Sequence, residues 1–421
     1  MKKSQMRQVF NLPTEFSISR DLIAGVTIGI ITIPQAMAFA LLAGLPPIYG
    51  LYGSFIPLII YGFFASSNYL NIGPVSVISI FIFQTLSLYV TPFTSEYIQA
   101  VGILGIWVGL IQLLMGVFRL GKYVSLIPKS VITGFIQAAA VVIIVSQLSL
   151  AFGLKIPSEL SFSSKIIYFI NEFSEVHIAT TILFIFSLIL LFVVTSVKAQ
   201  FPTSISLLIV TGLLAYFFEF EDKGIRLIGE IPQGLPVFIL PTFDLESLKF
   251  LPGAFGIAFV ASVGSIIMAK SLEDKQPFPF LPNRELIALG VAKIFNAFFG
   301  SLIPAGSFNR SILTYKIGAQ TQIAGLISAL MILFTLFFLT PIIYFLPEPV
   351  IASIIIFSVY FLFDFNAIKT YWNTDKMELF YLVSTMLITF IFGFVIGIFS
   401  GIAIKICIDF ILSKFYFSDK A

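Results

Sequence analysis

The feature that most constrains this chain is a succession of apolar segments long enough to cross a lipid bilayer. A spanning helix needs about 20 mostly apolar residues, and such segments recur from residue 22 to residue 415 with mostly short polar breaks. Charged residues make up 11% of the chain, whereas soluble domains carry about a quarter. Because so few charges cannot cover a water-facing surface, we predict an all-α integral membrane protein.

The apolar segments form two groups of seven, separated by a polar stretch at residues 220–250. We expect the first seven spans at 22–44, 46–65, 74–91, 97–118, 124–152, 177–197 and 202–219. We expect the second seven at 251–271, 284–300, 307–316, 319–342, 348–363, 377–392 and 394–415. The predicted domains are a cytoplasmic N-terminal segment (1–21), a first repeat (22–219), an extracellular or periplasmic connector (220–250), a second repeat (251–415) and a cytoplasmic tail (416–421).

The distribution of Lys and Arg predicts the orientation of the chain, because cytoplasmic loops carry an excess of these residues. With the N-terminus inside, the inner loops of the expected spans hold most of the positive residues, including Arg119, Lys122, Lys129, Lys198, Lys270, Lys275, Arg284, Lys316, Lys369 and Lys376. The outer loops hold only Lys155, Lys165, Lys223, Arg226 and Lys249. We therefore expect both termini in the cytoplasm and the protein in a bacterial inner (plasma) membrane.

Residue patterns that would support catalysis are weak. The single His177 has no second metal ligand at a useful spacing, and the single Cys407 cannot form an internal disulfide. The chain carries no GxSxG, HExxH, CxxC or Walker A pattern. It also has no basic run of the kind that binds nucleic acid. We predict no catalytic residue, no metal, no cofactor and no nucleic-acid partner, and hence no enzyme.

Two apolar segments are short or broken, and each is third in its group of seven. One begins at Gly73-Pro74, and the other follows Pro304-Ala305-Gly306 and is interrupted by Asn309 and Arg310. Paired broken segments in corresponding halves indicate an inverted-repeat transporter with a binding site near the bilayer midplane. The alternative is that Pro and Gly only kink two ordinary spans.

Arg310 is the residue that most strongly indicates a function. It lies in Gly306-Ser307-Phe308-Asn309-Arg310-Ser311, where a charge within an apolar region must be paired, hydrated or functional. The local sequence offers no acidic partner, and a guanidinium beside free helix N–H groups suits an anion. The alternative is that Arg310 snorkels to the inner surface or meets backbone carbonyls.

The remaining candidate site residues lie in the first, third and tenth spans. Gln35 is a neutral hydrogen-bond donor beside Pro34, and Phe39 lies on the same helical face. Val75 and Ser76 open the third span, where backbone N–H groups lack intrahelical partners. If this end faces Ser307 and Phe308, two positive helix ends converge on one small anion. The alternatives are an interhelical hydrogen bond for Gln35, packing for Phe39 and a capped kink at the third span.

These residues also form longer blocks. Ile33-Pro34-Gln35-Ala36-Met37-Ala38-Phe39-Ala40 followed by Gly44-Leu45-Pro46-Pro47-Ile48-Tyr49-Gly50-Leu51-Tyr52 resembles the signature of the SulP (sulfate permease) family, which includes prestin and pendrin. Ile72-Gly73-Pro74-Val75-Ser76-Val77, Asn283-Arg284-Glu285-Leu286-Ile287-Ala288-Leu289-Gly290 and the Gly306–Ser311 block are similar to family segments of the third, ninth and tenth spans. The resemblance covers residues 15–415.

The resemblance implies 14 spans in a 7+7 inverted repeat, with spans 1–4 and 8–11 forming a core domain and the others a gate domain. It implies an anion site between the starts of spans 3 and 10, moved by an elevator-like slide of the core. By position, the site would be lined by Gln35, Phe39, Val75, Ser307, Asn309 and Arg310. Many relatives carry Ser at the position of Asn309.

Two departures from the family pattern bear on mechanism. Many relatives carry an acidic residue in span 8 that is linked to proton or sodium coupling, and the chain has Gly264 at this coupling position. We therefore expect transport without a cation bound there. Relatives usually continue into a cytoplasmic STAS domain, whereas this chain ends at Ala421, so we expect no STAS domain and leave open a homodimer through the membrane domain.

The leading prediction is a secondary transporter of a small inorganic anion (sulfate, bicarbonate or chloride), working by exchange or uniport within the lipid bilayer. A nucleobase permease of similar architecture is one alternative, although it would need a carboxylate at the position of Gly264 to bind the edge of the base. The other alternative is a prestin-like motor or sensor that transports no solute.

Overall fold

A computed structural model describes residues 17–124, 128–157, 160, 162–197, 203–229, 233–242, 244–276, 279–361 and 363–418. Most of the predicted N-terminal segment and the last residues of the predicted tail lie outside the described residues. Seven helices in the described part are long and apolar enough to cross a membrane by length and composition. Of the other predicted spans, the last is a continuous helix of 25 residues, and the rest are shorter or interrupted helices.

Each of the 14 predicted spans corresponds to a helix. The first seven are α2 (Ile18–Leu42), α3 (Pro47–Phe64), α4 (Ser76–Leu86), α5 (Ser95–Val117), α7 (Lys129–Ser146) continued by α8 (Leu148–Phe152), α10 (Ile178–Val197) and α11 (Thr203–Phe217). The second seven are α12 (Leu251–Ser271), α13 (Pro282–Ala297), α14 (Phe308–Ile317), α15 (Ile323–Phe338) continued by α16 (Thr340–Ile343), α17 (Glu348–Tyr360), α19 (Lys376–Phe392) and α20 (Phe394–Ser418).

Several short elements lie between the spans and were not predicted. They are α6 (Gly121–Val124), α9 (Phe162–Asn171), α18 (Phe365–Thr374), and the 3-10 turns η1 (Phe173–Glu175), η2 (Leu245–Phe250) and η3 (Glu273–Lys275). The helix α18 begins where the Asp364 carboxylate accepts a hydrogen bond from the Ala367 backbone N–H at 2.8 Å. A search for long apolar segments misses α9 and α18 because each has only 10 residues.

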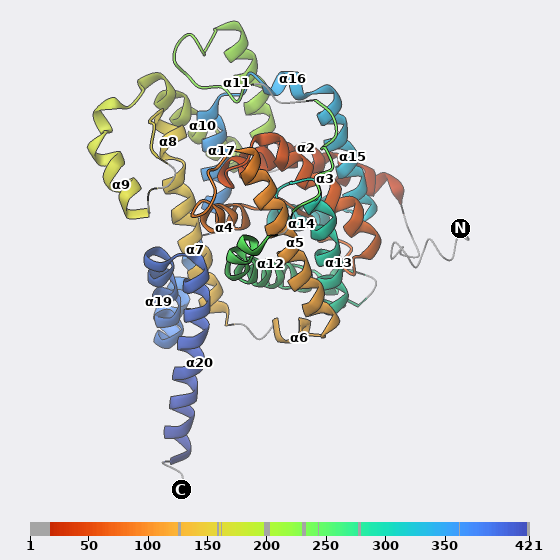
Figure 1. The fold of residues 1–421 in the computed structure, drawn as a ribbon, viewed down its shortest axis with the longest axis vertical. Helices are drawn as coiled ribbons and strands as arrows, with labels where there is room; N and C mark the ends of the chain where they lie inside the picture. The colour runs from red at the N-terminus through yellow and green to blue at the C-terminus, as the bar shows by residue number, and fades with distance from the viewer. Residues whose placement is uncertain are drawn as a thin grey trace.

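The helices pack into two groups that correspond to the predicted core and gate domains. In the core, α13 packs along α5 and α3, and α15 packs along α2 and α3. In the gate, α19 packs along α7 and α20, and α10 packs along α17. In Figure 1 the α7, α19 and α20 helices stand together at the lower left, beside the core helices. The fold is therefore the 7+7 inverted repeat with core and gate domains.

Buried carboxylates tie the ends of core helices to loops from the other half of the chain. Glu285, at the start of α13, is fully buried and accepts hydrogen bonds from the Tyr61 hydroxyl and from the backbone N–H groups of Ser66 (2.9 Å) and Ser67 (3.2 Å). Asp21, also fully buried at the start of α2, accepts from the Gln320 backbone N–H at 2.6 Å. These contacts join segments more than 200 residues apart in the sequence.

We expect Glu285→Ala to destabilise the protein, because it leaves the Ser66 and Ser67 N–H groups buried without an acceptor. Each such group costs about 1–3 kcal/mol. The measurement is the apparent melting temperature of detergent-purified protein by fluorescence-detected size exclusion. Asp274→Ala removes an exposed acid on the nearby turn η3 and serves as the control. Equal melting temperatures for the two variants would contradict this role of Glu285.

Candidate functional site

Two half-length helices meet at the centre of the molecule. The helices α4 and α14 have 11 and 10 residues, or about 16 Å and about 15 Å of length, which is roughly half of the bilayer hydrocarbon core. Each follows a two-residue strand, and β1 (Ile72–Gly73) pairs antiparallel with β2 (Ala305–Gly306). Ile72 lies opposite Gly306, and Gly73 opposite Ala305. This pairing places the two helix N-termini side by side, as the two broken segments predicted.

The first turns of these helices present backbone N–H groups toward the space between them. In the described part of the chain no side chain caps α4, whose first residue follows Val75, and its first N–H groups lack intrahelical acceptors. Ser307 caps α14 by accepting from the Arg310 backbone N–H at 3.5 Å, and its own N–H donates to the Asn71 carbonyl at 3.0 Å. Both helix starts also carry the positive end of the helix dipole, so the space between them is electropositive.

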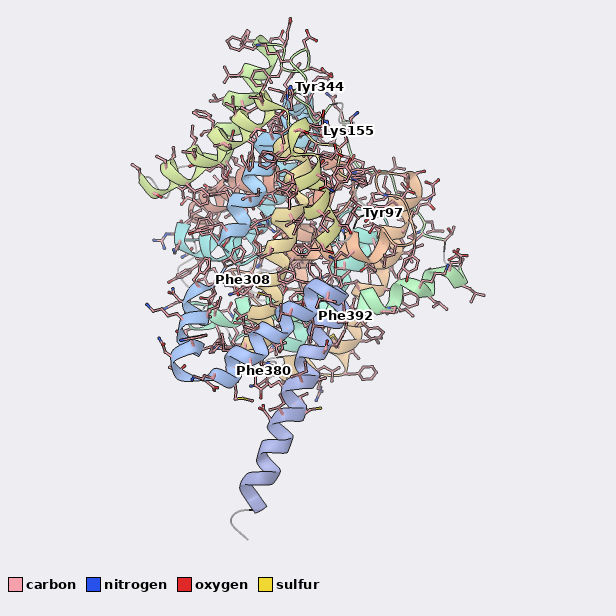
Figure 2. The ribbon with its side chains drawn as sticks, turned by 90° about the vertical axis from the view of Figure 1, so that its left-hand side faces the viewer. Tyr97, Lys155, Phe308, Tyr344, Phe380 and Phe392 are labelled. Carbon is pink, nitrogen blue, oxygen red and sulfur yellow. The ribbon has the colours of Figure 1, made fainter. Side chains whose placement is uncertain are left out.

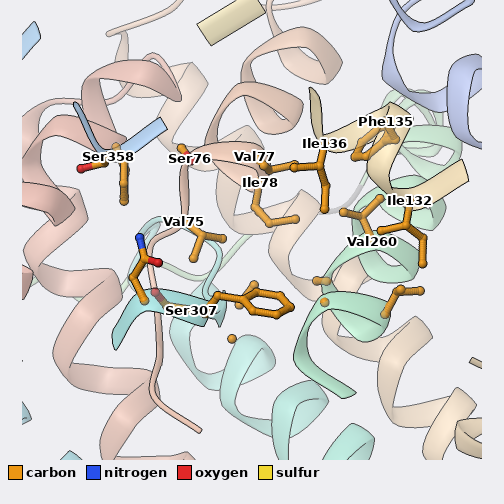
Figure 3. Close-up of a pocket in the computed structure, with 18 of the residues that line it drawn as sticks. Val75, Ser76, Val77, Ile78, Ile132, Phe135, Ile136, Val260, Ser307 and Ser358 are labelled. Carbon is orange, nitrogen blue, oxygen red and sulfur yellow. The ribbon is translucent and has the colours of Figure 1, made fainter. Parts of the chain in front are cut away.

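A cavity of about 140 Å³ opens at this point, and we call it the central cavity. Its core-domain wall includes Gln35, Phe39, Val75, Ser76, Gly264, Ser307, Phe308 and Asn309. Its gate-domain wall includes Ile132, Phe135, Ile136, Ser358 and Ile398. Figure 3 shows Val75 and Ser307 on one side of the cavity, with Ile132, Ile136 and Val260 across from them. The structure thus brings together seven of the eight predicted binding residues and Gly264.

The cavity lies at mid-depth in the molecule. Figure 2 shows Phe308 between Tyr344 toward one end and Phe380 toward the other. Phe308 is 41% exposed although it lies far from both ends, because its ring borders the cavity instead of packed side chains. A single water needs at least about 10–15 Å³ of such volume. The central cavity therefore has room for a small ion together with several waters.

Arg310 is placed differently from the sequence expectation, because its guanidinium lies behind the cavity wall and not in the wall itself. It is 1% exposed. Its Nε donates to Asn71 Oδ1 at 2.9 Å, one Nη to the Pro74 carbonyl at 3.1 Å and the other to Gln35 Oε1 at 3.5 Å. No carboxylate of the described residues pairs with it. The charge of Arg310 is therefore held by neutral oxygens beside the two helix starts.

The contact with Arg310 orients the side-chain amide of Gln35. A guanidinium has only donors, so it must meet the amide oxygen of Gln35. The amide NH₂ is then directed away from Arg310, and Gln35 lines the cavity. The NH₂ of Gln35 is consequently free of this contact and can donate to a ligand in the cavity, which favours a negatively charged or oxygen-rich ligand.

Three residues that the sequence did not single out complete the site. The Asn71 side-chain oxygen accepts from Arg310 Nε, the Asn71 carbonyl accepts from the Ser307 N–H, and the Asn71 N–H donates to Ser311 Oγ at 2.9 Å. Ser265 of α12 accepts from the Gly306 backbone N–H at 3.0 Å, which fixes β2 against span 8. Ser358 brings a hydroxyl from the gate domain. An Asn or Ser in an apolar chain is too common to be recognised without knowing which strands and helices meet.

Two glycines control how closely the walls approach. A Cβ on Gly73 would lie 3.0 Å from an Nη atom of Arg310, so a side chain there would displace the guanidinium. A Cβ on Gly264 would meet nothing within 4 Å. Because Gly264 lines the central cavity, this position has open space where a longer side chain would enter the cavity.

The sequence analysis also missed a second buried cation. Lys293 of α13 is 1% exposed and its Nζ donates to Gln112 Oε1 at 2.6 Å. The Gln112 amide donates in turn to Ser262 Oγ of α12 at 2.8 Å. The chain of hydrogen bonds links α13, α5 and α12. Lys293 does not line the central cavity and is a structural link within the core.

Comparison with known proteins gives a consistent result. "Probable sulfate transporter 4.2" of Arabidopsis thaliana is 37% identical over 399 residues, covering 92% of this chain and 58% of that protein. The inward-facing structure of the murine anion transporter Slc26a9 has a TM-score of 0.89 and 26% identity, covering 98% of this chain and 72% of that one. The transmembrane domain of the cyanobacterial bicarbonate transporter BicA has a TM-score of 0.81 and 23% identity, covering 92% and 100%. This last similarity concerns the fold alone.

Two inverted seven-span repeats, with paired half-helices at a central cavity, define an integral membrane protein of the inverted-repeat class. The chain belongs to the sulfate permease family, since residues 18–385 match the profile described as "Sulfate permease family". The chain spans 58% and 57% of the lengths of two plant sulfate transporters that it matches.

Proposed function

We propose that this chain carries a small inorganic anion across the membrane as a secondary transporter. The substrate is sulfate, bicarbonate or chloride, and it binds in the central cavity between the starts of α4 and α14. The substrate-binding residues are Gln35, Phe39, Val75, Ser76, Ser307, Phe308 and Asn309, with Arg310 acting from behind the wall. Transport is by exchange or uniport, and no enzymatic step is involved.

The observation that carries this proposal is the one-sided chemistry of the central cavity. Its described lining contains hydroxyls, amides and backbone N–H groups but no carboxylate. Two helix N-termini and the Arg310 guanidinium add positive potential without a compensating negative charge. A cation would be repelled here, whereas an anion meets oriented donors, among them the first N–H groups of α4, which no side chain of the described residues caps.

The position of the cavity supports an elevator-type movement. Its two walls belong to different helix groups, because Val75 and Ser307 lie on core elements while Ile136 and Ser358 lie on gate elements. The gate wall is mainly aliphatic and offers little that would hold an ion. The anion-binding groups therefore move as one body with the core while the gate stays in place.

The relatives support the same substrate class. The plant relative is named a probable sulfate transporter and the mouse structure is that of an anion transporter. A nucleobase permease would want a carboxylate at the position of Gly264, where the cavity has none. The prestin-like alternative predicts no solute flux at all and is separated by the transport measurement below.

Several further features are part of the proposal. Both termini lie in the cytoplasm, and the membrane is a bacterial inner (plasma) membrane. The domain limits are residues 1–21, 22–219, 220–250, 251–415 and 416–421, as predicted from the sequence. The lipid bilayer is the immediate environment, and a homodimer forms through the membrane domain.

Val75→Trp tests whether transport uses this cavity. An indole at the start of α4 would fill the space between the two helix starts, so we expect counterflow of labelled chloride, sulfate or bicarbonate to be lost in proteoliposomes. Val193→Trp, on an exposed face of α10, adds the same bulk away from the cavity and should retain counterflow. Unchanged counterflow in Val75→Trp would refute the location of the site.

A further inference from the structure

A second cavity lies on the same seam between core and gate as the central cavity. It has a volume of about 510 Å³. Its core wall includes Phe81, Gln84 and Thr85 of α4 and Gly253 of α12, and its gate wall includes Val142 and Ser146 of α7, Thr389 of α19 and Phe394 of α20. The helices α4, α12, α7 and α20 therefore border both cavities. Because the same four helices border both cavities, the cavities form successive parts of one passage.

The two cavities are only a short distance apart along these helices. On α4, Ile78 lines the central cavity and Phe81 the second, a separation of about 4.5 Å along the helix axis. On α7, Ile136 lines the central cavity and Val142 the second, a separation of about 9 Å. Roughly one layer of side chains therefore divides the two spaces.

That layer contains a cluster of three buried aromatic rings, Phe81, Phe135 and Phe394. The ring centroids of Phe394 lie 5.5 Å from Phe81 and 5.4 Å from Phe135, both edge to face, and those of Phe81 and Phe135 lie 6.4 Å apart. The three side chains are at most 2% exposed. Phe135 lines the central cavity, whereas Phe81 and Phe394 line the second. The cluster therefore forms the partition that separates the central cavity from the second cavity.

The cluster joins the two domains. Phe81 belongs to the core and is seated on α12, because a Cβ on Gly256 would lie 2.5 Å from its ring. Phe135 and Phe394 belong to the gate helices α7 and α20. A slide of the core along the gate would carry Phe81 away from the other two rings. The partition is therefore closed in this structure and would open through the same movement that carries the anion.

The second cavity has the character of an anion entrance. Its described lining includes Lys165 and Lys249 and no acidic residue. Lys165 lies over the Phe83 ring at 5.6 Å, and Lys249 pairs with exposed Glu246 at 3.2 Å. Hydroxyls and an amide from Thr85, Ser146, Thr389 and Gln84 line the interior. With both termini in the cytoplasm, this cavity lies toward the outer face.

We propose that the second cavity is the outer half of the anion pathway, and that the Phe81–Phe135–Phe394 cluster is the barrier that closes it from the central cavity. This rests on the proposed transport of a small inorganic anion. Three apolar rings offer an ion no replacement for its hydration shell, so the closed cluster blocks it as a hydrophobic constriction does. The ligand of the second cavity is the same small anion, in hydrated form.

Single-cysteine labelling tests the barrier without requiring transport. The chain has one cysteine, Cys407, so Cys407→Ser provides the background in cells expressing the full chain. A membrane-impermeant sulfonate thiol reagent added outside should react faster with Ser146→Cys, in the second cavity, than with Ser358→Cys, in the central cavity. Adding Phe394→Ala should remove the protection of Ser358→Cys. Phe394→Leu keeps an apolar side chain without the ring contacts, and it should also reduce the protection of Ser358→Cys. It replaces Phe394→Ala if the alanine variant does not fold.

The matched control is Phe184→Ala, since Phe184 is buried to a similar degree (7% exposed) and packs on Phe152 at 5.9 Å, away from both cavities. It should leave Ser358→Cys protected. An unreactive Ser146→Cys, or a Ser358→Cys rate that Phe394→Ala and Phe394→Leu leave unchanged, would overturn the proposal.

A flux measurement provides the second arm of the test. In proteoliposomes without an external counter-anion, Phe394→Ala should release chloride faster than the unaltered protein, and Phe184→Ala should release it at the rate of the unaltered protein. A Phe394→Ala protein that releases chloride no faster than the unaltered protein would count against the barrier. If the unaltered protein carries none of the three anions, the proposed function fails, and the labelling rates still decide whether the cluster separates the two cavities.

Discussion

Replacing Arg310 by alanine is expected to weaken anion binding by about five- to thirtyfold. A unit charge near an ion contributes on the order of 1–2 kcal/mol at an effective dielectric constant of about 20, which corresponds to this change in Kd. The variant also releases Gln35, whose amide is oriented by the guanidinium. Both effects lower affinity, and both can be measured as the anion concentration that half-saturates counterflow or a binding isotherm.

Two further variants separate charge from geometry. Arg310→Lys keeps the positive charge but cannot serve Asn71, Pro74 and Gln35 together, as the three-armed guanidinium does. The anion affinity of Arg310→Lys should therefore lie between that of Arg310→Ala and that of the unaltered protein. Lys316→Ala removes an exposed cation from the same helix and should change affinity little. If Arg310→Ala binds anions as tightly as the unaltered protein, the positive potential does not come from Arg310.

Gly264→Glu is expected to abolish anion binding near neutral pH and to restore part of it in acid. The position has open space around its Cβ and lines the central cavity, so the new carboxylate would sit beside the bound anion. Two negative charges repel by about 4 kcal/mol when roughly 4 Å apart at an effective dielectric constant of about 20. An ordinary Glu has a pKa of about 4.3, so lowering the pH protonates it and removes the repulsion.

The control for this variant is Gly264→Gln, which has nearly the same size and no charge. It should bind anions much better than Gly264→Glu at neutral pH, and its affinity should not depend on acidification in the same way. Equal losses in both variants would mean that crowding and not charge is responsible. In the unaltered protein, anion uptake that is strongly stimulated by an inward proton gradient would contradict the expectation that transport is not coupled to a cation at Gly264.

The span pattern could be read from the sequence because burial in lipid imposes a simple rule on composition. Each span needs a long apolar run, and breaks such as Gly73-Pro74 and Pro304-Ala305-Gly306 stand out within those runs. The prediction that the third and tenth spans are short and meet was therefore accessible. The β1–β2 pairing that aligns them was not, since two-residue strands leave no periodic signal.

The details of the site depend on partners that are distant in sequence. Arg310 looked like a wall residue because only its neighbours in the chain were visible, and its acceptor Asn71 is 239 residues away. Asn71, Ser265 and Ser358 became significant only when the fold placed them beside β2 or across the cavity. The same limit applies to Lys293, whose partner Gln112 lies on another span. Local sequence shows a buried charge but not which oxygens hold it.

The central claim, that the cavity between α4 and α14 carries a small inorganic anion, is tested most directly by a counterflow panel. Proteoliposomes containing the purified chain are preloaded with sulfate, bicarbonate, chloride or uracil, and uptake of the matching radiolabelled solute is followed at equal pH on both sides without a sodium gradient. The structure predicts counterflow of at least one of the three anions and none of uracil. Counterflow of uracil alone, or of no solute in the panel, would contradict the claim.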